Sequence, residues 1–167
     1  MNFRTADAAF AVDRTYVVRV PYRGQATIRE LVQLGHYDQT SRKLDDASFH
    51  FSRQADECVS IHLLSRNGSN VSMRDILTAF AVRRLRPANA AEMLALGAQQ
   101  PDLQLLFAII TFETPWFDVP FFRPAVSLRS HIRLFRKGYR INRIAEVTWV
   151  TELRNFNGSW LFAGTPT

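Results

Sequence analysis

Hydrophobic and polar residues alternate with a period of two in several stretches of the chain, and this pattern predicts β-strands. In the segment Thr15–Tyr22 the side chains of Tyr16, Val18 and Val20 fall on one side. Alternate side chains of a strand point to opposite faces, so this segment has one face suited to a core. The same reasoning and the enrichment in β-branched and aromatic residues predict the strands Thr15–Tyr22, Glu57–Leu64, Ala108–Phe112, Val126–Phe135, Tyr139–Val150 and Trp160–Phe162.

Three helices are predicted where apolar residues at helical spacing follow a capping residue. Each begins with Thr, Ser or Asn and has an acidic residue three positions later, which is the capping-box pattern. We expect Gly35 and Gly97 to end the first and third helices in a left-handed conformation, and Pro87 to stop the second from continuing. The expected helices are Thr27–Leu34, Met73–Leu85 and Ala90–Leu96, with one further turn at Asp102–Leu106.

The order of these elements predicts a single α+β domain over residues 1–167, with a mostly antiparallel sheet and three short helices packed on it. The second half is expected to form an antiparallel meander, in which Lys137-Gly138 is the turn between two strands. Residues 36–56 read as an ordered loop held by Phe49 and Phe51.

Composition places the chain among folded globular proteins and indicates a reducing compartment. The chain has 167 residues, of which 47% are hydrophobic, and a formal net charge of +6. Cys58 is the only cysteine, which excludes an intramolecular disulfide framework. Charged residues interrupt the apolar positions near the N-terminus, and no apolar stretch is long enough to cross a bilayer. We therefore expect a cytoplasmic protein without a membrane-spanning segment.

No recognised catalytic or metal-binding motif stands out, and no cofactor is expected. Cys58 and His62 lie on the same face of a predicted strand, but four residues of strand span about 13 Å, too far for a nucleophile and its base. The four histidines are spread singly, so no zinc motif matches. A folded site could still gather His36, Asp38 and His50. Enzymatic activity has no positive support in the sequence, so a non-enzymatic role is favoured, and an unrecognised enzyme or a small-ligand binder is kept as an alternative.

One segment is strongly basic. No acidic residue occurs between Asp118 and Glu146, while Arg123, the predicted hairpin and its turn carry seven cations, with His131 and Tyr139 among them. A basic β-ribbon with interleaved aromatic residues can follow a phosphate backbone, so DNA or RNA is a candidate partner. The candidate contact residues are Arg129, Arg133, Arg136, Lys137, Arg140 and Arg143. The alternative is that these cations pair with acidic residues elsewhere or only solvate a sheet face.

A second candidate surface is the segment Thr114–Pro124, in which four aromatic residues and three prolines occur within eleven positions. Prolines make this connection stiff and exclude a central strand. Its rings either cap the core or form an interaction surface, through which the protein would bind a partner or a second copy of itself. The residues of this alternative are Trp116, Phe117, Phe121 and Phe122.

The middle of the chain resembles a family of short uncharacterised bacterial proteins. The resemblance rests on Arg86-Pro87-Ala88, Leu94-Ala95-Leu96-Gly97 and Pro101-Asp102-Leu103-Gln104, which match the family's RPA, LLALG and PDLQ stretches. It covers roughly residues 16–107, whereas residues 107–112 depart from the FPIVALG-like segment of the family. The resemblance implies a self-contained bacterial domain inside the cell and brings no activity, ligand or site residue with it.

Overall fold

The structure is a computed structural model, and it describes residues 10–21, 27–46, 48–49, 57–66, 70–112, 122–136, 138–151, 155–157 and 159–167. It is the expected α+β domain with a mostly antiparallel sheet, and a short fourth helix joins the three expected ones. The elements are β1 (Phe10–Val20), α2 (Ile28–Leu34), β2 (Gln39–Thr40), β3 (Glu57–Arg66), β4 (Val71–Ser72), α3 (Met73–Val82), β5 (Leu85–Pro87), α4 (Ala90–Gln99), α5 (Leu103–Leu106), β6 (Ala108–Phe112), β7 (Phe122–Phe135), β8 (Gly138–Thr151), β9 (Asn155–Phe156) and β10 (Trp160–Pro166).

Capping boxes start the three longer helices, as predicted. At α2 the Thr27 hydroxyl accepts a hydrogen bond from the Glu30 N–H, and the Glu30 carboxylate accepts one from the Thr27 N–H. The same reciprocal pairs form at the starts of α3 and α4. Each box satisfies two backbone donors that a helix otherwise leaves unpaired, and an N-cap side chain is worth about 1 kcal/mol.

The ends of α2 and α3 differ from the prediction. Gly35 does cap α2, but its φ of −76° is right-handed, and the left-handed residue is His36 with φ 47°. Helix α3 ends at Val82 and not at Leu85, because Arg84 takes φ 54° and turns the chain into β5.

Gly97 does not end α4, which continues to Gln99. A Cβ atom at position 97 would overlap the Tyr37 hydroxyl and would lie 2.9 Å from Leu128 Cδ1. The glycine is therefore required by close packing of the helix against its neighbours, and not by a left-handed stop.

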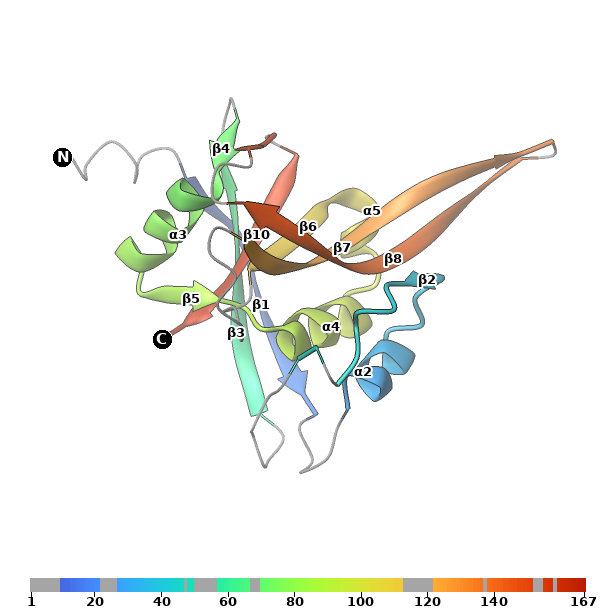
Figure 1. The fold of residues 1–167 in the computed structure, drawn as a ribbon, viewed down its shortest axis with the longest axis horizontal. Helices are drawn as coiled ribbons and strands as arrows, with labels where there is room; N and C mark the ends of the chain where they lie inside the picture. The colour runs from blue at the N-terminus through green and yellow to red at the C-terminus, as the bar shows by residue number, and fades with distance from the viewer. Residues whose placement is uncertain are drawn as a thin grey trace.

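The strand order of the main sheet is β1-β3-β10-β6-β7-β8-β2, with β5 beside β10 (Figure 1). The C-terminal strand β10 lies between β3 and β6 and runs parallel to β6, so the second half is not the simple antiparallel meander that we expected. Leu161, Phe162 and Ala163 of β10 are all buried. Such an unbroken apolar run is typical of a central strand that is covered on both faces.

Two hydrophobic clusters cover the two faces of this sheet. Consecutive residues divide between them: Leu63 and Ile109 belong to the cluster with α2 and α4, whereas Leu64 and Ile110 belong to the cluster with α3. The α3 cluster is rich in phenylalanine, and Phe156 makes edge-to-face contacts with the rings of Phe112, Phe162 and Trp160, at 5.7, 5.7 and 5.9 Å between centroids. Both faces of the inner sheet are thus packed against described residues.

Candidate nucleic-acid interface

The outer half of the β7–β8 hairpin stands away from the rest of the domain (Figure 1). Pairing of β6 with β7 stops at Leu128, and β2 pairs with β8 only at Ile144 and Ala145. Beyond these points, within the described part of the chain, β7 and β8 pair only with each other. We call residues 129–143 the ribbon arm.

The tip of the ribbon arm is a hairpin turn that lies one position before the predicted Lys137-Gly138. Strand β7 ends at Phe135 and β8 begins at Gly138, and these two residues are paired. The turn therefore begins at Arg136, and Gly138 is the first residue of β8. Gly138 has φ 149°, a value that residues with a side chain seldom adopt. Lys137 itself is outside the described residues.

The register divides the arm into two faces, because directly opposite residues of paired strands share a face. Arg133 pairs with Arg140 and Arg129 with Ile144, so these three arginines lie on one face. Arg143 pairs with Ser130 and lies on the other face. The expectation that alternation gathers several cations on one face is thus met by three arginines, and Arg143 is not among them.

Arg129 and Arg140 on the basic face form ion pairs with carboxylates. Arg129 lies against Glu146, with Nε 2.8 Å from Oε1 and an Nη2 hydrogen bond of 3.0 Å to Oε2. Arg140 donates to Asp38 Oδ1 at 2.5 Å, although 66% of its side chain remains exposed. The alternative interpretation was that the cations of the arm pair with acidic residues elsewhere in the chain. It holds for Arg129 and Arg140, whose partners Glu146 and Asp38 lie outside the arm.

Asp38 is bound to the backbone of β8. The Arg143 backbone N–H donates to Asp38 Oδ2 at 2.8 Å, and the Asp38 N–H donates to the Arg143 carbonyl at 3.0 Å. The Arg143 N–H, helped by the side chain of Arg140, lowers the pKa of Asp38, while its partial desolvation opposes the shift. The ionised carboxylate of Asp38 thus holds the base of the arm in place.

The Arg143 guanidinium serves the fold and is not available to a partner. It donates to the carbonyls of Gly35 at 2.7 Å and Gly97 at 2.5 Å, and to Gln104 Oε1 at 3.2 Å. These groups lie at the ends of α2 and α4 and in α5, where the helix dipoles favour a cation. The guanidinium also lies 5.1 Å from the ring centre of Tyr37, whose pKa is raised by burial.

The cations nearest the hairpin turn in sequence are Arg133, Arg136 and Lys137. Arg133 and Arg136 are exposed in the structure. The arm has six cationic residues and no acidic one, and Asp38 and Glu146 pair with two of the six, Arg140 and Arg129.

The sequence analysis missed the apolar face of the arm. Ile132 pairs with Ile141 and Leu134 with Tyr139, and all four side chains are exposed, Leu134 by 80% and Tyr139 by 70%. They share the face that carries Arg143, opposite the basic face. The signal was present in the sequence, since Ile132 and Leu134 alternate with the cations of β7.

The candidate catalytic groups Cys58 and His62 are not brought together in the structure. Cys58 is exposed and lies opposite Arg19, whereas His62 Nδ1 lies 3.0 Å from Thr15 Oγ1 on β1. Among the described residues no three His, Cys, Asp or Glu side chains could hold a metal ion together. His50 lies outside the described part of the chain.

Only one end of the aromatic and proline segment falls within the described residues. This end differs from the prediction, because Phe122, Arg123 and Pro124 are the first residues of β7 and pair with Thr151, Val150 and Trp149 of β8. The strand thus begins before Pro124 and not at Val126, and residues 122–124 are not the irregular connection that the prolines were expected to impose. Trp116, Phe117 and Phe121 lie outside the described part. The interaction surface proposed for this segment therefore stays a prediction.

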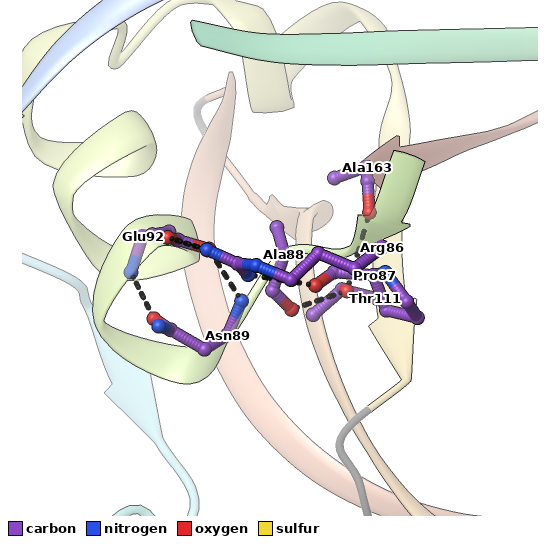
Figure 2. Close-up of polar contacts among 7 residues, drawn as sticks. All are labelled: Arg86, Pro87, Ala88, Asn89, Glu92, Thr111 and Ala163. Atoms are coloured by element: carbon purple, nitrogen blue, oxygen red, sulfur yellow. Dashed lines mark hydrogen bonds and ion pairs between the residues drawn. The ribbon is translucent and has the colours of Figure 1, made fainter. Parts of the chain in front are cut away.

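A cluster of buried polar groups lies at the start of α4 (Figure 2). The Glu92 carboxylate is fully buried and accepts hydrogen bonds from Arg86 at 2.6 and 2.9 Å and from the Asn89 N–H at 2.8 Å. Nearby, the Thr111 hydroxyl bonds to the carbonyl of Ala88. Each of these polar groups is paired within the cluster, so its geometry is that of a structural clasp between β5, α4 and β6.

Comparison of the chain with models of protein families, with curated proteins and with solved structures gave no match. Among the described residues, no helix is both long and apolar enough to cross a membrane. The fold and the surface therefore define the molecule only as an α+β domain that carries a projecting, basic β-ribbon.

Proposed function

We propose that this protein binds DNA or RNA, without sequence preference, through the basic face and the turn of the ribbon arm. The observation that supports the proposal is the combination of shape and charge: a ribbon that stands clear of the domain and has six cations and no acidic residue. The major groove of DNA admits a two-stranded β-ribbon. Cations that neutralise phosphates release counterions, which supplies affinity that does not depend on sequence.

In this proposal the cations of the arm have different roles. Arg133, Arg136 and Lys137 are the cations nearest the hairpin turn in sequence, and they are the expected phosphate contacts. Arg140 is bound to Asp38 in an exposed ion pair, and such pairs contribute at most about 1 kcal/mol, so a phosphate can replace the carboxylate. Arg143 holds the base of the arm and does not contribute. Three phosphate contacts are thus expected, and four if Arg140 exchanges its partner.

A salt-titrated binding assay tests the proposal. Fluorescence anisotropy with labelled duplex DNA, single-stranded DNA and RNA should show binding at low salt. The logarithm of the affinity for duplex DNA should fall with the logarithm of the salt concentration at a slope of about −3, as three contacts at about −0.9 each require. Replacement of Arg133, Arg136 and Lys137 by Ala should weaken binding to all sequences alike and bring the slope close to zero.

A matched variant separates the arm from the net charge of the protein. Arg29, Arg42 and Arg74 are exposed on the body of the domain, so their replacement by Ala removes the same charge. This control should keep the slope near −3. Absence of binding to any of the three nucleic acids at low salt, or equal losses in the two triple variants, would contradict the proposal.

A further inference from the structure

The ribbon arm has an apolar face that nothing in the described structure covers. It consists of two adjacent cross-strand pairs, Ile132 with Ile141 and Leu134 with Tyr139, which are 57%, 38%, 80% and 70% exposed. Cross-strand neighbours lie about 5 Å apart, so the four side chains form one continuous patch. Scattered exposed apolar residues need no explanation, but a contiguous patch on a projecting ribbon does.

A nucleic acid bound to the basic face leaves this patch unexplained. The face of Arg133 and Arg140 and the face of Leu134 and Tyr139 point in opposite directions. A phosphate backbone on the first face therefore cannot cover the second. The body of the domain does not cover the patch either, since its side chains remain exposed. The occupant must present an apolar surface of its own.

We infer that the apolar face of the ribbon arm pairs with the same face of a second copy of this chain. Two such ribbons can pack face to face about 10 Å apart around a two-fold axis, so that each patch meets an identical apolar patch. The arrangement brings no basic faces together, because the face of Arg133 and Arg140 points away from the contact in both copies. It leaves the basic faces of both arms open to nucleic acid.

The area of the patch indicates a weak dimer. If each fully exposed side chain contributes somewhat under 200 Å², the four residues expose roughly 400 Å² per copy. The two patches together then bury roughly 800 Å², which is below the area of a stable interface and is the size of a weak, transient contact. We therefore expect a dimer that forms only at high protein concentration.

Sedimentation velocity of the purified protein from about 1 to 200 μM tests the pairing. The wild type should shift from monomer to dimer across this range. Leu134→Glu places a charge in the patch and should raise the dissociation constant of the dimer by about tenfold or more. Since Leu134 is 80% exposed, this variant should fold normally, which its circular dichroism and thermal midpoint verify.

Val17→Glu is the matched control, because Val17 is a 70% exposed apolar strand residue on β1, outside the arm. It should leave the dimer unchanged within about twofold. A wild-type protein that stays monomeric throughout, or a dimer that survives Leu134→Glu, overturns the inference. The inference does not depend on nucleic-acid binding: added salt should preserve or strengthen a dimer of two cationic chains, whereas it weakens phosphate contacts.

Discussion

Replacement of Arg143 by Met tests whether this arginine holds the ribbon arm to the domain. The other arginines of the arm are the ones that can face a partner. Met keeps an apolar stem beside Tyr37 but removes the guanidinium that binds the carbonyls of Gly35 and Gly97 and the side chain of Gln104. All three acceptors then lose a charged donor, and the ends of α2 and α4 lose the cation that suits their dipoles.

The size of the effect follows from these contacts. A hydrogen bond to a charged group contributes about 1.5 to 3 kcal/mol, but the losses are not additive because Arg143 is only partly buried and water can reach some of the freed groups. We expect the free energy of unfolding to fall by about 3 kcal/mol. For a domain of this length the thermal midpoint should then drop by roughly 6 to 12 °C.

Urea denaturation followed by circular dichroism measures this loss. Arg136→Met is the control, since Arg136 is an exposed residue of the turn and its replacement should change stability by less than about 0.5 kcal/mol. In a binding assay the two variants should show the opposite effects. Arg136→Met should make the salt slope less steep by the amount of one phosphate contact, about 0.9, and Arg143→Met should leave the slope unchanged. A loss below about 1 kcal/mol for Arg143→Met would refute the structural role.

Three further changes probe the fold around the arm. Arg86→Met should cost about 3 kcal/mol, because it leaves the Glu92 carboxylate buried without its charged partner, and urea denaturation measures it. Gly97→Ala should destabilise by roughly 1 to 2 kcal/mol despite the better helix propensity of alanine, because the new methyl group overlaps the Tyr37 hydroxyl; an increase in thermal midpoint would contradict this. The pKa of Asp38 is lowered from 3.8 in the folded state, so its carboxylate stabilises the fold above that pH and loses this effect as the pH falls through the folded pKa. The stability difference between wild type and Asp38→Asn should therefore be largest above about pH 5 and shrink toward pH 3, and a difference that grows on acidification would reverse the argument.

Features that depend on residues close in sequence could be predicted from the sequence. The capping boxes at Thr27, Ser72 and Asn89 each involve a partner three positions away, and all three form. The strands follow from alternation for the same reason, and Ala108–Phe112 is found with the predicted bounds. The hairpin between β7 and β8 is equally local, although its turn begins at Arg136, one position before the predicted Lys137-Gly138.

Features that depend on distant partners could not be predicted. The placement of β10 between β3 and β6 joins segments from opposite ends of the chain, and alternation carries no information on such neighbours. Arg143 binds a carbonyl 46 residues away and another 108 residues away, so its separation from the other arginines of the arm is visible only in the fold. The apolar pair of Ile132 and Leu134, in contrast, was readable from the alternation of β7.

The salt dependence of nucleic-acid binding tests the central claim most directly. Wild type should bind duplex DNA with a slope of about −3 in logarithmic affinity against logarithmic salt, and the variant lacking Arg133, Arg136 and Lys137 should approach zero. The body variant that lacks Arg29, Arg42 and Arg74 should keep the wild-type slope. Equal slopes in the arm variant and the wild type, or no binding at low salt, would contradict the assignment of the ribbon arm as a nucleic-acid interface.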